Sequence, residues 1–349
     1  MYWFAGCFAL LVFVFGASVS FGRTGNIDLA TVFRGIGAVL GFSDPLSSVD
    51  QARVQLRLIE AIATAGVGAA LALSGSLLQG VFRNGLAAPS IIGVSSGASL
   101  GAAVAVVILG GYLPYFASLT ATNDAPFFVA GASFLGALAA TSLIALIATR
   151  HGRLSVPTLL LAGIAVNACC GGCLAAIQAV SLKDYEIARA IFAWTFGSLE
   201  DKSFGQAVLV WWAVLAAAAC IPFVADELDL FVGGEEDAAS LGVRPNLVKV
   251  IAVTAATLAA ATAVAVAGQI AFVGLVVPHV LRLMIGPSHR VLLPFSIVGG
   301  ALFLLGAQLL QVSLLGDSAL RPGVLMSLIG GPFFIILLLT RTKDLRAWE

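Results

Sequence analysis

One pentapeptide in the sequence has the spacing of a catalytic serine. Residues 93–97, GVSSG, follow the G-x-S-x-G pattern, in which a serine on a sharp strand-to-helix turn attacks a carbonyl carbon. That chemistry also needs a histidine base, and the three histidines of the chain are His151, His279 and His289. No strand pattern precedes Ser95. We therefore expect no hydrolase activity from this motif.

A second set of residues could bind a soft metal or haem. Cys169, Cys170 and Cys173 stand close together, and His279 follows Pro278 in an apolar stretch where it could contact a substrate, including haem iron. The alternative for the cysteines is that they are small residues that let helices approach closely. The alternative for His279 is a residue at the start of a helix, hydrogen-bonded within the bundle. We favour both alternatives and expect no metal site.

The most polar stretch of the chain is residues 226–246, DELDLFVGGEEDAASLGVRPN. The carboxylates at 235–237 would occupy the first turn of a short helix, where they complement the helix dipole. Gly242 can end that helix with a left-handed cap, and the alanines at 238–239 leave room for a groove on a partner. We predict a helix over 235–241 that lies in water and contacts a partner. The residues assigned to this contact are Glu235, Glu236, Ala238, Ala239, Leu241 and Gly242.

The composition places the rest of the chain in a membrane. Mean hydropathy is +1.05 and only 10% of residues are charged, whereas about 25% is usual in a soluble domain. The apolar runs are long and lack the alternation of a membrane strand, so they are helices, which satisfy their own backbone hydrogen bonds. The formal net charge is zero, so no partnership with nucleic acid is expected.

The fold class expected is an all-α polytopic membrane protein with about ten transmembrane helices in one domain, residues 1–349. The N-terminal run lacks a basic region and a clear cleavage site, so we interpret it as a retained first span. An even number of spans puts both termini on one side. The apolar units are approximately 3–21, 57–82, 90–112, 126–149, 156–180, 205–225, 247–267, 271–285, 291–315 and 322–340.

The orientation follows from Lys and Arg in the short loops. Ten of the 18 basic residues lie on one side and eight on the other, and the bias grows when the long 22–56 loop is discounted. The ten-residue side is therefore expected to be cytoplasmic, together with residues 226–246 and both termini, including the C-terminal segment 341–349.

Two glycine-rich stretches have the same design. Residues 74–102 and 268–294 each leave a helix, break at Gly or Pro, turn, and begin a new helix. They occupy corresponding places if units 2–5 and 7–10 are repeats, and the spacing makes those repeats inverted. Inverted repeats with broken helices are a recurring architecture of transporters.

These stretches also carry a resemblance to a known family. SGSLLQGVFRNGLAAPSIIGVSSGASLGA, GQIAFVGLVVPHVLRLMIGPSHRVLLP and PGVLMSLIGGPFFIILLLTR are similar to signatures of the FecCD family, the permease subunits of type II ABC importers. LFVGGEEDAASLGV resembles the cytoplasmic segment that docks on the ATPase in that family. The residues matching the signatures are Gln79, Asn84, Pro89, Gly93, Gly97, Gly274, Pro278, His279, Arg282, Gly330 and Pro332.

The resemblance implies an importer of ferric siderophores, with haem or cobalamin as the alternative cargo. It implies a homodimer in a bacterial inner membrane, with two ATPase subunits on the cytoplasmic face and a periplasmic substrate-binding protein on the other. The chain lacks a G-x-x-x-x-G-K-[ST] phosphate loop. It is therefore expected to be no enzyme and to bind no cofactor, with ATP and Mg on the partner subunit.

Several positions depart from the family pattern. Asn-Pro-Leu-Ala-Asp/Glu-Pro becomes NGLAAP at 84–89, and Arg-Leu-Pro-Arg becomes RLIE at 57–60. An Ala-Asp pair followed by an Arg becomes Ala307-Gln308 and Val312, and Glu-Leu-Pro becomes ALR at 319–321. Arginines on the outer face of this family pair with carboxylates on the binding protein. The resemblance assigns that docking to Arg57, with Arg53 and Arg321 as nearby substitutes.

The translocation path is expected along residues 158–180, by resemblance. Asn167 and Gln178 are polar side chains at depth, and together with Ser95 and Ser96 they either line the path or bond neighbouring helices. The rival to an ATP-driven importer is an ion-coupled secondary carrier, which would place acidic groups or histidines inside the bilayer. Such residues are almost absent, since Glu60 is expected at a helix end.

Overall fold

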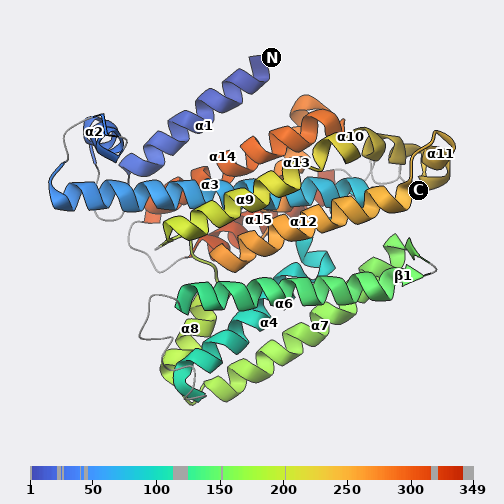
Figure 1. Cartoon of the computed structure of the whole chain (residues 1–349), viewed down its shortest axis with the longest axis horizontal. Coiled ribbons are helices and arrows are strands. Elements are labelled where there is room, and N and C mark those ends of the chain that lie inside the picture. Colours follow the sequence, from blue (N-terminus) through green and yellow to red (C-terminus); the bar gives the residue numbers. More distant parts are fainter. Residues whose placement is uncertain are drawn as a thin grey trace.

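The computed structural model describes residues 2–21, 25, 27–39, 41–42, 46–112, 125–150, 152–200, 202–315 and 321–340, which are almost entirely helical (Figure 1). His151, residues 319–320 and the C-terminal segment 341–349 lie outside the described residues. The helices, in order, are α1 (Tyr2–Ser20), α2 (Leu29–Val39), α3 (Ser48–Phe82), η1 (Pro89–Ile92), α4 (Val94–Val107), η2 (Ile108–Tyr112), α6 (Ala125–Ala148), α7 (Val156–Ser181), α8 (Tyr185–Thr195), α9 (Phe204–Ala218), α10 (Ile221–Leu230), η4 (Phe231–Gly233), α11 (Glu235–Ser240), α12 (Pro245–Ala267), α13 (Val273–Ile285), α14 (His289–Leu315) and α15 (Pro322–Thr340).

Five of the described helices are long and apolar enough to cross a bilayer, namely α3, α6, α7, α12 and α14. A sixth span results if α9 and α10, which meet at a 52° bend, are taken together. Shorter apolar helices lie within α1, α13 and α15, and another runs through α4 into η2. The polytopic all-α class is confirmed, while the number of ten crossings stays a prediction.

The centre of the bundle is α3. Within the 18-residue apolar stretch of this helix, 94% is buried. It contacts α9, α12, α13 and α14, and its small side chains allow these helices to approach closely. The closest approaches involve glycine. A Cβ added at Gly75 would lie 1.8 Å from the carbonyl oxygen of Gly274, and one at Gly68 would lie 2.2 Å from that of Gly300.

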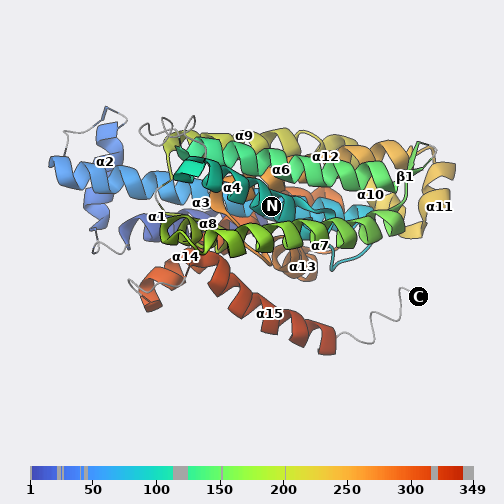
Figure 2. The ribbon, with the colours of Figure 1, turned by 90° about the horizontal axis from the view of Figure 1, so that it is seen from below.

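The helix contacts are those expected of two repeated units. α3 contacts α13 and α14, and its counterpart α12 contacts α4 and α6. Within the first unit α4 contacts α6 and α7, and within the second α13 contacts α14 and α15. The last helix, α15, diverges from the others along most of its length (Figure 2). The arrangement agrees with repeats at units 2–5 and 7–10.

Several elements were not predicted. α2 and α8 lie in segments expected to be loops, and a short hairpin of β1 (Thr149–Arg150) and β2 (Arg153–Leu154) joins α6 to α7. α3 begins at Ser48 rather than 57, because the Ser47 side chain caps it by accepting from the Asp50 N–H at 3.2 Å. The unit expected over 90–112 is broken at Gly93, whose φ of +84° ends η1 before α4 begins.

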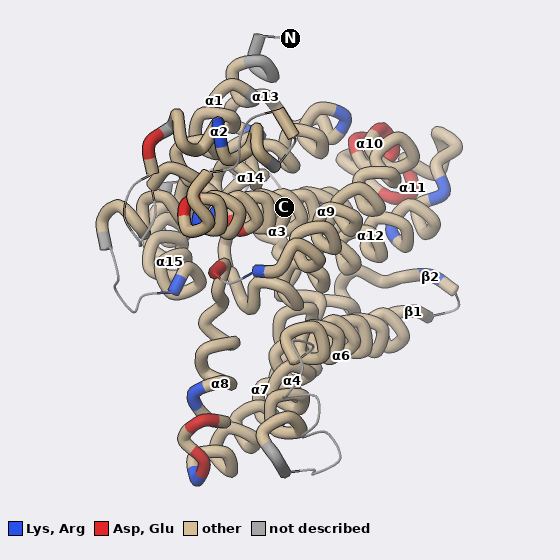
Figure 3. The backbone as a smooth tube through the Cα atoms, turned by 60° about the vertical axis from the view of Figure 1, so that its left-hand side comes forward, with Lys and Arg blue, Asp and Glu red and all other residues tan. Residues whose placement is uncertain are grey.

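The molecule has two polar ends. α2, α8 and the start of α3 lie at one end, and β1, β2 and α11 lie at the other (Figures 1 and 2). Charged residues gather at these ends, around α2 and α8 and around α10 to α12, while the lengths between them are almost uncharged (Figure 3). We refer to the two ends as the α2 end and the α11 end.

Candidate functional site

The polar segment at the α11 end folds as two short helices, α10 and α11, joined by η4. The helix predicted over 235–241 is present as α11, with Leu241 as its C-cap and Gly242 at φ +91°. The Gly242 N–H donates to the Ala239 carbonyl at 3.0 Å and the Val243 N–H to the Ala238 carbonyl at 3.1 Å. This pair of bonds is a Schellman motif, so the cap forms for the reason the glycine indicated.

The exposed face of this segment is apolar at its two ends. Leu241 is 68% exposed and Val232 is 70% exposed, with Glu236 and Ala239 exposed between them and Gly242 exposed after Leu241. Ala238 is fully buried against the chain itself, which corrects the expectation that it offers a surface to a partner. Val232 and Leu241 thus leave apolar side chains exposed at an end of the molecule where charged residues gather.

The segment is attached to the first half of the chain through Lys249. The Lys249 ammonium, only 4% exposed, lies 2.8 Å from a Glu235 carboxylate oxygen and donates to the Leu154 carbonyl at 2.7 Å. Asn246 adds to this link, since its side chain accepts from the Leu154 N–H and donates to the Gly152 carbonyl, both at 2.9 Å. The β-hairpin, α11 and the start of α12 are therefore one connected unit.

A second attachment runs from α10 to the start of α14. The Asp229 carboxylate accepts from the backbone N–H of His289 at 2.8 Å, pairs with its Nδ1 at 2.6 Å, and accepts from the Ser288 hydroxyl at 2.8 Å. The sequence analysis did not single out Asp229 or Lys249. In the sequence, each of these two is a charged residue beside an apolar run. That position does not indicate which residue of the chain it will contact.

The residues of the two main signatures meet inside the bundle. Gln79 Nε2 donates to the carbonyls of Ala87 and Gly274, both at 3.3 Å, and Arg282 donates to Gln79 Oε1 at 2.5 Å. These bonds fasten the loop at 84–89 to α13. Their role is to hold α3, η1 and α13 together.

The remaining signature residues support the same packing. The Asn84 side chain accepts from the Leu86 N–H at 2.9 Å. Gly330 is buried, and a Cβ there would lie 2.3 Å from the Phe272 ring. His279 lies within α13, seven residues into a helix that begins at Val273, so its placement at the start of a helix is corrected. The signature proline Pro332 is an exposed residue inside α15.

The polar residues assigned to the path are mostly engaged in the chain. Asn167 Nδ2 donates to the Ser90 carbonyl at 3.0 Å, and its Oδ1 accepts from the Ser96 hydroxyl at 2.5 Å. The Ser95 carbonyl accepts from Gln269 at 3.3 Å. Asn167 and Ser96 thus bond neighbouring segments, while Gln178 is a half-buried residue near the end of α7.

The residues of the chemical motifs lie on helices. Ser95 lies in the first turn of α4 after a 3-10 helix, not after a strand, so the setting of a nucleophile elbow is missing there. Among the described residues, no group of three His, Cys, Asp or Glu side chains could hold a metal ion. Cys170 packs against the core of this copy, whereas Cys169 and Cys173 are exposed on α7.

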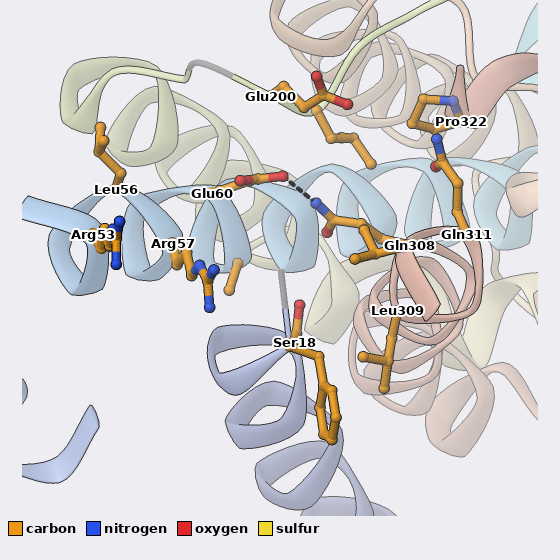
Figure 4. A pocket seen from close by; sticks show the side chains of 14 residues that line it. Ser18, Arg53, Leu56, Arg57, Glu60, Glu200, Gln308, Leu309, Gln311 and Pro322 are labelled. Carbon is orange, nitrogen blue, oxygen red and sulfur yellow. Dashed lines mark hydrogen bonds between the residues drawn. The ribbon is translucent and has the colours of Figure 1, made fainter. Parts of the chain in front are cut away.

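The α2 end carries a cavity of about 240 Å³ between α1, α3 and α14 (Figure 4). Arg57, assigned to docking, is 9% exposed and donates to the carbonyls of Val19, Ser20 and Gly25 at 3.3, 3.0 and 2.5 Å. Its guanidinium therefore caps the carboxyl end of α1. This corrects the expectation that Arg57 is presented to a binding protein.

The other two arginines assigned to docking differ from Arg57. Arg53 is 47% exposed, with Asp50 at 3.9 Å. Arg321 is half-buried and donates to the Ala193 carbonyl at 2.9 Å, which joins α8 to the start of α15. Of the three, Arg53 is the residue whose side chain the structure places at the surface.

Two departures from the family pattern contact each other in the cavity. Gln308 Nε2 donates to a carboxylate oxygen of Glu60, so the changes on α3 and α14 form one pair (Figure 4). Glu60 also lies inside α3, because that helix begins at Ser48. The expectation that Glu60 stands at a helix end is therefore wrong.

Known proteins resemble the chain over nearly its whole length. It is 39% identical over 294 residues to the cobalamin import system permease protein BtuC of Halobacterium salinarum, covering 84% of this chain and 74% of that protein. It is 36% identical over 291 residues to the hemin transport system permease protein HmuU of Yersinia pestis, covering 83% and 84%. It is 34% identical over 286 residues to the Fe(3+)-citrate import system permease protein YfmE of Bacillus subtilis, covering 81% and 80%.

A solved structure and a family model agree with these relatives. A metal-chelate type ABC transporter in an inward-facing conformation superposes with a TM-score of 0.79 at 26% identity, covering 96% of this chain and 98% of that one. The model of the FecCD transport family matches residues 10–340. The chain belongs to the FecCD transport family.

Proposed function

We propose that this chain is the membrane-spanning permease subunit of an ATP-driven importer that moves an iron chelate, a ferric siderophore, into the cytoplasm by alternating access. The relatives are permeases of cobalamin, hemin and Fe(3+)-citrate systems. Haem and cobalamin are therefore the alternative cargoes. ATP hydrolysis belongs to a separate subunit.

The observation that carries this proposal is the construction of the α11 end. An exposed apolar face at Val232 and Leu241 stands on helices that are fastened to the bundle by the buried Lys249 and by Asp229. A partner that moves this face also moves the β-hairpin, α12 and the start of α14. The α11 end is then the cytoplasmic face where two ATPase subunits dock, residues 226–246 are the coupling segment, and the α2 end faces the binding protein.

The complete machine contains two copies of this chain. Within the 18-residue apolar stretch of α7, only 17% is buried in one copy. The exposed side of this helix therefore contacts a second copy or lines the path between the two copies. The protein belongs to a bacterial inner membrane with both termini in the cytoplasm. An ion-coupled carrier is the rival function, and Glu60 is its best candidate group, but its hydrogen bond with Gln308 gives it a role within the chain.

The test is uptake into proteoliposomes. The permease is reconstituted with its ATPase. ATP is supplied on the side of the α11 end, and the loaded binding protein is supplied on the side of the α2 end. Ferric siderophores, haemin and cobalamin are offered separately. The proposal expects ATP-dependent uptake of a ferric siderophore. Uptake of haemin or cobalamin alone identifies the alternative cargo, and uptake driven by an ion gradient without the ATPase contradicts the importer function.

A further inference from the structure

The cavity at the α2 end has a lining rich in hydrogen-bond acceptors. It is bounded by α1, α3, α14, the segment before α9 and the first residue of α15, and Glu60 and Gln308 point toward each other across it (Figure 4). Two arginines belong to its lining. Arg57 donates to backbone carbonyls at the end of α1, and Arg53 is 47% exposed beside Asp50. The acceptors that line it are on Ser18, Glu60, Glu200, Gln308 and Gln311.

One of these acceptors is buried and has no hydrogen-bond partner. Gln308 is 8% exposed, and its Oε1 accepts no hydrogen bond. The amide orientation is determined by Glu60, because Nε2 donates to that carboxylate and the flipped amide would place two oxygens together. A buried acceptor left without a donor costs free energy, so water or a group from a partner must supply one here.

We propose that this cavity receives the positively charged side chain, Lys or Arg, of the substrate-binding protein when it docks on the α2 end. Such a side chain supplies N–H donors to Gln308 Oε1 and a positive charge beside Glu60 and Glu200. This inference rests on the proposed function. The family pattern has an arginine at position 60, where this chain has Glu60, so the charge at that position is reversed relative to the pattern.

The size and position of the cavity favour a protein side chain. Its volume of about 240 Å³ is smaller than the roughly 300–1,000 Å³ of sites that enclose a whole small molecule. α3 has 35 residues, which is about 52 Å at 1.5 Å per residue, whereas the bilayer core is about 30 Å thick. The charged first part of α3, where Glu60 lies, therefore extends toward water, within reach of a docking protein.

The experiment measures capture of the loaded binding protein by the permease–ATPase complex in nanodiscs. We expect Glu200→Gln and Glu60→Gln each to raise the Kd by about tenfold at low salt, since a charge pair close to full burial is lost. Glu200→Lys should abolish capture. Glu186→Gln is the matched control, because Glu186 is an exposed acid on α8 outside the cavity and its loss changes the net charge equally.

A reciprocal exchange identifies the partner side chain. Each Lys and Arg on the docking face of the binding protein is changed to Glu, and one of these variants should bind the Glu200→Lys complex better than the wild-type complex. Basal ATPase activity and the elution volume of each complex show that it is folded. A Glu60 variant that fails to fold leaves the Glu200 variants to decide the matter.

Two results would overturn the inference. Unchanged capture by Glu200→Gln, in a complex whose wild type still shows ATP-dependent uptake, would remove the docking role while leaving the proposed function in place. Loss of co-purified phosphatidylethanolamine in Glu200→Gln, with capture unchanged, would assign the cavity to a lipid amine instead. Absence of uptake by the wild-type complex would contradict the proposed function itself, which separates the two failures.

Discussion

The ammonium of Lys249 lies 2.8 Å from the carboxylate of Glu235, at the junction of α11 and α12. The lysine is almost completely buried, at 4% exposure, whereas the carboxylate is 40% exposed. The same ammonium also donates to the Leu154 carbonyl of the β-hairpin. One side chain therefore joins α11 to the loop between α6 and α7.

Lys249→Met should loosen this junction. The Leu154 carbonyl loses its donor and Glu235 loses its pair, so we expect a loss of about 2 kcal/mol in stability, the cost of leaving buried polar groups unpaired. Unfolding in detergent and the ATPase activity stimulated by the loaded binding protein measure the two effects. The control is Arg244→Met, which removes an exposed positive charge nearby. Equal stability of the two variants would show that the Lys249 link is unimportant.

Leu241→Asp should prevent docking of the ATPase without unfolding the bundle. Leu241 is 68% exposed, so a charge there costs little in the free permease but is expensive under a partner. Co-purification with the ATPase and its transport-coupled hydrolysis are the readouts. Leu182→Asp is a close control, since Leu182 is 67% exposed at the α2 end. Normal assembly and transport by Leu241→Asp would refute the docking role of residues 226–246.

Asp229→Ala should weaken the attachment of α10 to α14. Three donors from Ser288 and His289 lose their acceptor, and we expect a loss of about 2 kcal/mol together with poorer coupling. Asp226→Ala is the comparison, because Asp226 is 67% exposed and reaches Arg290 only at 4.0 Å. A surface pair of that kind contributes under about 1 kcal/mol. Similar melting temperatures for both variants would contradict this prediction.

Gly75→Ala should be among the most destabilising single changes in the chain. The new Cβ would lie 1.8 Å from the Gly274 carbonyl oxygen, so α3 and α13 must separate, at a cost of about 3 kcal/mol or more. Gly306→Ala, on α14, serves as the control because nothing lies within 4 Å of a Cβ there. Yield and thermal stability in detergent are compared. A stable Gly75→Ala protein would mean that the two helices are farther apart.

Arg57→Met should release the carboxyl end of α1. The carbonyls of Val19, Ser20 and Gly25 lose their donor, so proteolysis between α1 and α2 should become faster. Arg53→Met leaves these bonds intact and is expected to leave the cleavage rate unchanged. If instead both variants resist protease equally, Arg57 does not hold α1.

The local features could be predicted from sequence, and the long-range pairs could not. The helix at 235–240 and its cap at Gly242 depend on residues within a few positions of one another, and the spacing indicates both. Glu60 and Gln308 are 248 positions apart, and neither residue type indicates the other. The same applies to Asp229 with His289, whose contact exists only because α10 bends back to the start of α14.

The extent of α3 was underestimated for a different reason. The first turns of α3 are polar. A helix predicted from a run of apolar residues begins only where that run begins, at residue 57. The Ser47 cap shows that the helix begins at Ser48, before the apolar run. Glu60 was therefore assigned to a helix end, and the cavity beside it could not be foreseen.

The uneven burial of the helices has a consequence for how readily the protein can be altered. The α3 window is 94% buried and that of α7 only 17%. Substitutions in α3 disturb several neighbours at once, whereas most positions on α7 can exchange one apolar side chain for another without repacking this copy of the chain. A library of apolar substitutions along the exposed positions of α7 should therefore retain folded members at high frequency, which makes this helix the practical starting point for engineering a permease with a different cargo.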